Sequence, residues 1–151
     1  MRKSYSDPNF SLRERALRFL AQREHSRREL ERKLAPHAGN AAELQSLLDD
    51  LERKKQLSDR RFAEGRARVL SRKYGAARIR HDLKVRGISE EISGKVSSGL
   101  NDLEKARQIL QRKYRDPATT REERAKRARF LQGRGFSYDA IRSALGALAD
   151  D

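Results

Sequence analysis

The chain has 151 residues, of which 36% are hydrophobic and 38% charged, and its formal net charge is +14. Typical globular chains are roughly 45–50% apolar and about 25% charged, so this composition excludes one deep core but can fill several thin cores between amphipathic helices. The positive excess predicts a polyanionic or acidic partner. There is no cysteine, no apolar run long enough to cross a bilayer and no signal-peptide core after Met1, so we expect a cytoplasmic protein without disulfides or a membrane partner.

In chain order, nine apolar-periodic segments are preceded by residues that start helices. A Ser, Thr or Asn oxygen at such a position accepts from the third helical amide, and a Glu at that third position reaches back to the cap. The predicted starts are Ser11, Ser26, Asn40, Ser58, Gly75, Ser89, Asn101, Thr120 and Ser137. The Glu is present as Glu14, Glu29, Glu43, Glu104 and Glu123. Helix stops are predicted at Pro36 with Gly39, Gly87, Gly99, Pro117 and Gly135.

The apolar spacing is helical throughout. One stripe is Leu44, Leu47, Leu48 and Leu51, and another is Ile92, Val96 and Leu100. These residues recur every three or four positions, and no segment alternates as a half-buried strand does. The sequence therefore predicts an all-α fold of about nine helices.

An internal repeat organises these helices. The residues Arg18-Phe19-Leu20, Arg23, Ser26 and Leu34 recur with identical spacing as Arg129-Phe130-Leu131, Arg134, Ser137 and Leu145. Leu30 and Ile141 match between them, and a weaker middle copy has Gly75, Ile79 and Leu83. We expect a flexible tip (1–10) and three tandem three-helix, helix-turn-helix-like modules (11–55, 58–99 and 101–149) in an elongated array, straight or curved.

The middle module is predicted to be the most basic, because Asp59, Glu64 and Asp82 are its only acids between Arg53 and Arg86. If one helix runs through the stretch, Arg61, Arg68 and Arg72 share a face. Arg80 and Lys84 stand one turn apart and repel each other, which favours a neutralising partner. The candidate residues for binding DNA or a filament are Arg27, Arg28, Arg61, Arg68, Arg72, Arg78, Arg80, Lys84 and Arg86.

Signs of catalysis are missing from the sequence. No glycine-rich phosphate loop occurs, the carboxylates are scattered, and His25, His37 and His81 fall in different modules without ligand spacing. We expect no catalytic residues, no metal, no cofactor and no enzymatic activity. The apolar-stripe positions of four aromatics favour core packing over base stacking: Phe19, Phe62, Phe130 and Phe136.

Three stretches together resemble the RecX family of recombination regulators. The first is FLAQREHSRREL, from Phe19 to Leu30. The second is SDRRFA, from Ser58 to Ala63, with Tyr74-Gly75, Arg78-Ile79 and Leu83 to Ile88 after it, and the third is RGFSYDAI, from Arg134 to Ile141. The likeness runs from about Ser11 to Leu148. One departure is Lys55-Gln56, where many members carry a Gly and an aromatic residue.

The resemblance implies a function as well as a fold of three tandem three-helix modules. It implies a protein that binds along the RecA recombinase filament on single-stranded DNA, restrains ATP hydrolysis and strand exchange, and has some DNA affinity of its own. We also expect a monomer with weak affinity for duplex DNA. The residues alone leave an alternative open, a sequence-specific helix-turn-helix DNA-binding regulator, for which only Ser26-Arg27-Arg28 looks able to read bases. Non-specific RNA or ribosome binding would also fit the charge.

Overall fold

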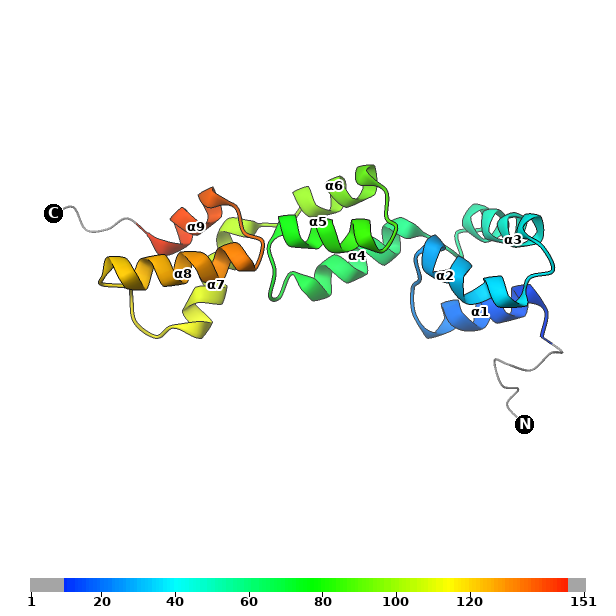
Figure 1. Ribbon diagram of the computed structural model, residues 1–151, viewed down its shortest axis with the longest axis horizontal. Helices are drawn as coiled ribbons and strands as arrows, with labels where there is room; N and C mark the ends of the chain where they lie inside the picture. Colours follow the sequence, from blue (N-terminus) through cyan, green and yellow to red (C-terminus); the bar gives the residue numbers. More distant parts are fainter. Residues whose placement is uncertain (1–9, 147–151) are drawn as a thin grey trace, which may run out of the picture. The chain divides into compact units, whose positions relative to one another are not determined.

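The computed structural model describes residues 10–146, and within that range the chain is helical without strands (Figure 1). The helices are α1 (Leu12–Gln22), α2 (Arg27–Leu34), the 3-10 turn η1 (Ala35–His37), α3 (Ala41–Arg53), α4 (Asp59–Leu70), α5 (Ala76–Val85), α6 (Glu90–Ser98), α7 (Asp102–Lys113), α8 (Arg121–Gly133) and α9 (Tyr138–Leu145). The predicted all-α class with nine helices is confirmed for this range. The predicted flexible tip lies outside the described residues except for Phe10, as do residues 147–149 of the predicted third module.

All nine predicted helix starts are confirmed. Each Ser, Thr or Asn cap accepts from the amide three residues on, as Ser26 does from Glu29. The return bond from a Glu side chain is present at Thr120 and Glu123, but Glu29 and Glu104 bind Arg23 and Arg107 instead. These two predicted reciprocal boxes are therefore wrong, because a nearby guanidinium gives the carboxylate a charge-assisted bond. The box at Asn40 is wrong as well, since Glu43 accepts from the Gly39 amide, one residue before the cap.

The ends of α3 and α8 form the same left-handed turn. After α3, the amides of Lys55 and Gln56 donate to the carbonyls of Glu52 and Leu51. After α8, Gly135 and Phe136 bind back to α8 in the same way. The left-handed position has φ +86° at Gly135 and φ +61° at Lys55. Lys55 thus departs from the family pattern in residue type but not in turn geometry. The turn still has the left-handed conformation that a glycine adopts without strain.

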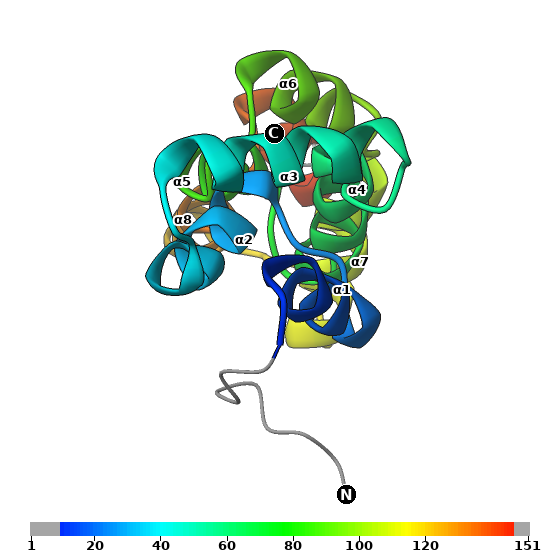
Figure 2. The ribbon, with the colours of Figure 1, turned by 90° about the vertical axis from the view of Figure 1, so that its right-hand side faces the viewer.

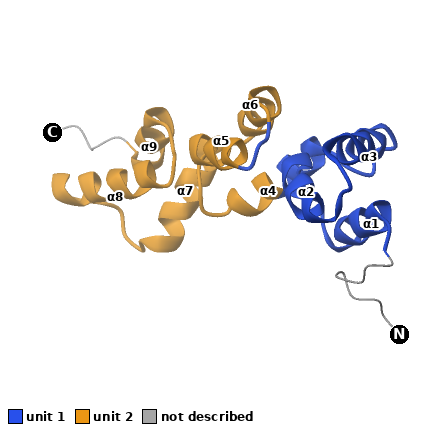
Figure 3. Ribbon diagram, turned by 45° about the vertical axis from the view of Figure 1, so that its right-hand side comes forward, with its two compact units in different colours: residues 1–65, 86–88 blue, residues 66–85, 89–151 orange. Residues whose placement is uncertain are grey.

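The chain divides into two compact units (Figure 3). Unit 1 comprises residues 1–65 and 86–88, of which residues 10 onward are described. Its apolar core is made by α1, α2 and α3 and is closed by Leu57 after α3; Figure 2 turns this bundle toward the viewer. Leu30, Leu34, Leu48 and Leu51 are fully buried. The predicted stripe of α3 is therefore the face that packs against α1 and α2.

Unit 2 comprises residues 66–85 and 89–151, described as far as residue 146. One of its cores lies between α7, α8 and α9, around Leu110, Leu131 and Ile141. The buried residues Ile79 and Leu83 come from α5, which packs on α6. The repeat positions Leu30, Ile79 and Ile141 are all buried, as expected for matching core positions.

The turn before α5 meets the turn before α9 inside unit 2. The Gly75 amide donates to the Arg134 carbonyl at 2.7 Å. A β-carbon at Gly75 would stand 2.5 Å from the Gly135 oxygen, so only glycine allows this approach of two backbones. Asp102, at the start of α7, accepts from the Ala76 amide at 3.1 Å and so caps α5. Burial raises the pKa of Asp102.

The three predicted module boundaries stay a prediction. The division into two units follows the density of contacts and does not test them. No helix within residues 10–146 combines the length and the apolar character that a membrane crossing needs.

Candidate functional site

Arg27, the first residue of α2, is engaged inside unit 1. Its guanidinium contacts Asp49 at 2.7 Å and Glu52 at 3.1 Å, and it donates to Gln45 at 2.8 Å. The Arg27 amide donates to Asp59. A guanidinium held by two carboxylates of α3 has little charge left for an outside anion, so Arg27 fits a structural role better than the predicted binding role.

Other predicted cations also have carboxylate partners within their own unit. In unit 1, Arg61 contacts Glu24 at 2.8 Å. In unit 2, Arg80 and Lys84 both contact Glu90 at the start of α6. The pKa of Glu90 is lowered, first by the hydrogen bond from Lys84 and then by that from Arg80. Glu90 already offsets the repulsion between Arg80 and Lys84, so this repulsion no longer favours an outside partner, and their binding role stays a prediction.

The predicted helical face of Arg61, Arg68 and Arg72 is also wrong in part. Helix α4 ends at Leu70, where the amides of Lys73 and Tyr74 both bind the Leu70 carbonyl. Arg72 therefore lies in the turn that follows, because the chain bends there to bring Gly75 against the α8–α9 turn. Arg68 and Arg72 are exposed.

The remaining candidates differ in whether the described residues contact them. Neither Arg28 of unit 1 nor Arg68 of unit 2 has an ion pair among the described residues, and both side chains stay exposed. Arg78 donates to the Gly133 carbonyl at 2.8 Å and stacks on Tyr74 at 4.4 Å. The Arg86 carbonyl accepts from the Ser26 hydroxyl. Arg78 thus fastens α5 to the end of α8 within unit 2.

A hollow of about 280 Å³ in unit 2 collects cations that the sequence list mostly missed. We call it the basic hollow, and its lining is Arg72, Lys73, Ile109, Arg112, Lys113, Phe130 and Arg134. The cations come from the turn after α4, the last turn of α7 and the residue that ends α8. None of these lining residues is acidic.

The ends of three helices explain why these cations can gather. A helix C-terminus carries a partial negative charge that stabilises a nearby cation by about 0.3–1 kcal/mol. Lys113 lies over the Phe130 ring at 4.1 Å, and Arg134 lies over the same ring at 5.0 Å. Such cation–π contacts are worth about 0.5–1 kcal/mol at exposed sites. These terms hold the cations in place without neutralising them.

One sequence signal could have located the basic hollow. The tripeptide Arg-Lys-Tyr occurs twice, at Arg72-Lys73-Tyr74 and at Arg112-Lys113-Tyr114. Both Arg-Lys pairs line the hollow. Their proximity depends on the meeting of Gly75 and Gly135, which helical periodicity does not predict.

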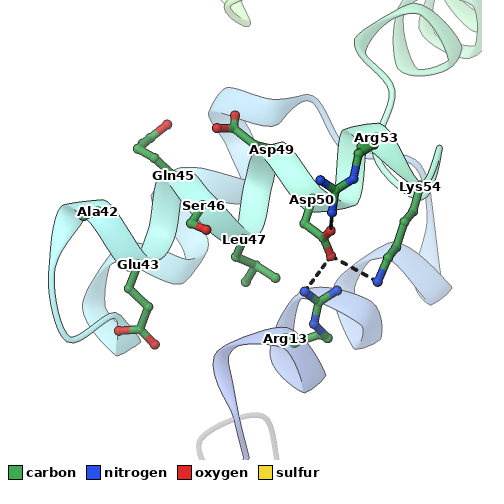
Figure 4. Close-up of a pocket in the computed structure, with 10 residues that line it drawn as sticks. All are labelled: Arg13, Ala42, Glu43, Gln45, Ser46, Leu47, Asp49, Asp50, Arg53 and Lys54. Carbon is green, nitrogen blue, oxygen red and sulfur yellow. Dashed lines mark hydrogen bonds and ion pairs between the residues drawn. The ribbon is translucent and has the colours of Figure 1, made fainter.

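A larger hollow of about 950 Å³ in unit 1 has a different electrostatic character (Figure 4). Its lining mixes the acids Glu43, Asp49 and Asp50 with three bases. Asp50 points at those bases and contacts all three: Arg13 at 2.6 Å, Lys54 at 3.2 Å, and Arg53. The hydrogen bond from Arg13, followed by that from Lys54, lowers the pKa of Asp50 to about 2. Because its charges are balanced internally, this hollow offers less to an anion than the smaller one.

His25 is buried at the turn before α2. Its Nδ1 lies 3.0 Å from the Arg23 carbonyl and its Nε2 lies 3.0 Å from the Lys33 ammonium. The Nδ1 therefore carries the proton and Nε2 accepts from Lys33. Desolvation lowers the pKa of His25, which suits a neutral structural histidine. Within residues 10–146 no three metal-ligating side chains gather into a metal site.

Two family models match the chain. The model described as "RecX, second three-helix domain" matches residues 58–95. The model described as "RecX, third three-helix domain" matches residues 101–145. Together they span α4 to α9, which include every element of the basic hollow.

Curated relatives and solved structures agree with these models. A protein named regulatory protein RecX from Leptothrix cholodnii is 42% identical, with 95% of this chain and 92% of the relative covered. Its namesake from Herbaspirillum seropedicae is 43% identical over 91% of this chain and 90% of the relative. The crystal structure of RecX from Lactobacillus salivarius has a TM-score of 0.76 at 24% identity, covering 86% of this chain and 89% of that chain. At that identity the structural likeness concerns the fold alone.

Proposed function

This chain belongs to the RecX family of regulatory proteins, and we propose that it binds the RecA recombinase filament on single-stranded DNA and inhibits ATP hydrolysis and strand exchange by that filament. It acts as a monomeric, cytoplasmic modulator of recombination and DNA repair and carries out no chemistry itself. The observation that carries the proposal is the near full-length match to relatives named regulatory protein RecX. The target, RecA, comes from the family resemblance of the sequence signatures.

The charge of the molecule supports a nucleoprotein target. A net charge of +14 favours association with a polyanion. The acid-free lining of the basic hollow provides a local surface for such a partner. Among the residues first predicted to bind DNA or the filament, Arg68 and Arg72 of unit 2 and Arg28 of unit 1 remain the best candidates. Their side chains are exposed and have no carboxylate partner within residues 10–146.

Sequence-specific reading of duplex DNA is the weaker function. That alternative depended on the start of α2, where Ser26, Arg27 and Arg28 together looked able to read bases. Arg27 instead contacts Asp49 and Glu52. A recognition residue must leave its donors free for a base edge. Because Arg28 is then the one arginine of the three residues whose side chain is exposed without an ion pair among the described residues, this alternative has less support than filament binding.

Titrating this protein into RecA that hydrolyses ATP on single-stranded DNA tests the proposal directly. We expect inhibition at amounts well below one molecule per RecA subunit, because a bound modulator acts on a filament of many subunits. Hydrolysis that stays unchanged at excess protein, while binding to bare DNA persists, would overturn the proposed function. A longer DNA at fixed RecA separates filament inhibition from competition for DNA, because competition is relieved by extra sites.

A further inference from the structure

We propose that the basic hollow is a binding site for the phosphodiester backbone of single-stranded DNA, without preference for base sequence. The inference rests on the proposed function for the choice of DNA as ligand, and it adds the site and the chemical group recognised. The residues that carry it are Arg72, Lys73, Arg112, Lys113 and Arg134. Only Arg72 of these belongs to the set that the sequence predicted.

The state of the five side chains is the first argument. Arg72 and Lys73 are exposed and have no ion pair or side-chain hydrogen bond among the described residues. Arg112 makes one long bond, 3.5 Å, from Nε to the Gln108 carbonyl. Lys113 and Arg134 contact aromatic rings, which leaves their charges uncompensated. All five cations therefore retain donors for an anion.

The composition of the lining selects a phosphate over other anions. Three of the cations are arginines, whose planar guanidinium forms paired hydrogen bonds with phosphate oxygens. The two lysines add point charge without fixed geometry. A run of phosphates along one strand matches several cations that come from three different helix ends, whereas a single carboxylate matches one.

The position of Phe130 argues for backbone contacts and against base stacking. Its ring is partly buried against the α7–α9 core, and Lys113 and Arg134 already lie over the ring. A stacking platform must keep one ring face open for a base. Phe130 therefore holds two cations in place, and the hollow distinguishes phosphate charge but not base identity.

The backbone around the hollow is tied by hydrogen bonds on the side that presents these groups. The Gly75 amide donates to the Arg134 carbonyl, and Arg78 donates to the Gly133 carbonyl. Arg78 and Arg134 both contact the Tyr74 ring, at 4.4 Å and 5.4 Å from its centre. Cations on such a frame need little reordering to meet a strand, which favours binding.

The test compares two triple variants with equal loss of charge. The first variant removes the three cations of the hollow that make no ring contact, through Arg72→Gln, Lys73→Gln and Arg112→Gln. The control, Arg121→Gln, Lys126→Gln and Arg129→Gln, removes three exposed cations of α8 outside the lining. Binding of a fluorescent oligo-dT strand is measured by anisotropy over a range of salt concentrations, with circular dichroism as the check on helix content.

We expect the hollow triple to lose at least about tenfold in affinity near 0.1 M salt. The slope of log K against log salt should flatten by about 2, since each phosphate neutralised on single strands contributes about 0.7. The control triple should flatten it by less than about 0.7. Equal losses in the two triples would overturn the proposal, because affinity would then follow net charge alone. Wild-type binding too weak to measure would overturn it as well.

Single variants cover the case in which the triple loses helix content. Arg72→Gln and Arg112→Gln change two separate elements, and each should flatten the slope by about 0.7. A triple that keeps oligo-dT affinity but loses RecA inhibition would overturn the phosphate assignment in favour of an acidic protein surface. The two proposals can fail separately. If the wild type does not inhibit RecA but the hollow triple weakens oligo-dT binding, the proposed function is contradicted and the phosphate site in the hollow is supported. If the wild type inhibits RecA but the hollow triple binds oligo-dT no more weakly than the control triple, the phosphate site is contradicted and the proposed function is supported.

Discussion

Helices α3 and α8 end in turns with the same backbone geometry. They differ in the residue that stands one helical turn before the basic C-cap residue. Lys54 ends α3 and Arg134 ends α8, and each is followed by a left-handed residue. Four residues earlier stand Asp50 and Phe130, respectively. The Asp50 carboxylate contacts Lys54 as well as Arg13 and Arg53 (Figure 4). The Phe130 ring holds Arg134 without compensating its charge.

This difference explains why the two hollows differ in electrostatic character although both are lined by several cations. A count of basic residues treats both regions as positive. The carboxylate at Asp50 turns one region into a closed set of ion pairs that stabilises unit 1, whereas the ring leaves the other region available to a partner. At these two helix ends, the neighbour one turn back therefore decides whether the cation has a carboxylate partner.

The largest expected effect comes from breaking the frame of the basic hollow with Gly75→Ala. The added β-carbon would stand 2.5 Å from the Gly135 oxygen and 2.7 Å from its carbonyl carbon. Backbone must shift, so we expect a loss of about 2–3 kcal/mol in the free energy of unfolding, measured by urea denaturation, together with weaker oligo-dT binding.

Gly94→Ala is the matched control for that experiment. Gly94 lies inside α6, and a β-carbon there would meet nothing within 4 Å. Alanine in a helix interior should stabilise by about 0.5–1 kcal/mol. A Gly75→Ala variant as stable as wild type would contradict the close approach on which the hollow depends.

Gly75 illustrates which parts of the fold could be predicted from the sequence and which could not. Helix starts were predictable because a cap and its amide are three residues apart, as with Thr120 and Glu123. The end of α4 was not, because it depends on where Gly75 meets Gly135. The pairing of Arg27 with Asp49 and Glu52 likewise joins two helices, so a sequence-based list counted Arg27 as free.

The candidate site was predictable only in part for the same reason. Arg72 was found because it lies in a basic run. Arg112 and Lys113 were missed because they approach Arg72 only through the packing of α7 and α8 beside the turn after α4. The repeated Arg-Lys-Tyr tripeptide was the one local signal, and its meaning depends on that packing.

The second-largest expected effect comes from removing the carboxylate that balances the charges in the hollow of unit 1. Asp50→Asn keeps the side-chain shape but removes the charge that Arg13, Arg53 and Lys54 share. We expect tighter oligo-dT binding, with the salt slope steeper by up to about 0.7, one phosphate's contribution. The control Glu122→Gln makes the same change in net charge at an exposed residue of α8 that has no ion pair among the described residues. If both variants gain equally, local pairing does not control anion binding.

The same aspartate predicts a pH dependence of stability. Its pKa is lowered from 3.8 to about 2 in the folded protein. A lowered pKa means that the unfolded chain binds the proton more readily, so the stabilisation is complete above pH 3.8 and is lost as the pH falls toward 2. Comparing acid unfolding of the wild type with that of Asp50→Asn isolates this contribution. The difference between the two curves should shrink through this interval; a constant difference would show that Asp50 does not keep its charge through these contacts.

The smallest expected effect concerns the left-handed residue itself, Lys55 in unit 1 against Gly135 in unit 2. A side chain at φ +61° brings the β-carbon close to the following carbonyl. Lys55→Gly relieves that strain, although glycine also gives the unfolded chain more freedom, so we expect a net gain of about 0.5–1 kcal/mol in urea unfolding. Lys55→Ala is the control, because it removes the same charge and keeps the β-carbon. If alanine stabilises as much as glycine, the gain comes from reduced repulsion with Lys54 and Arg53, and the two turns then differ in charge rather than in backbone strain.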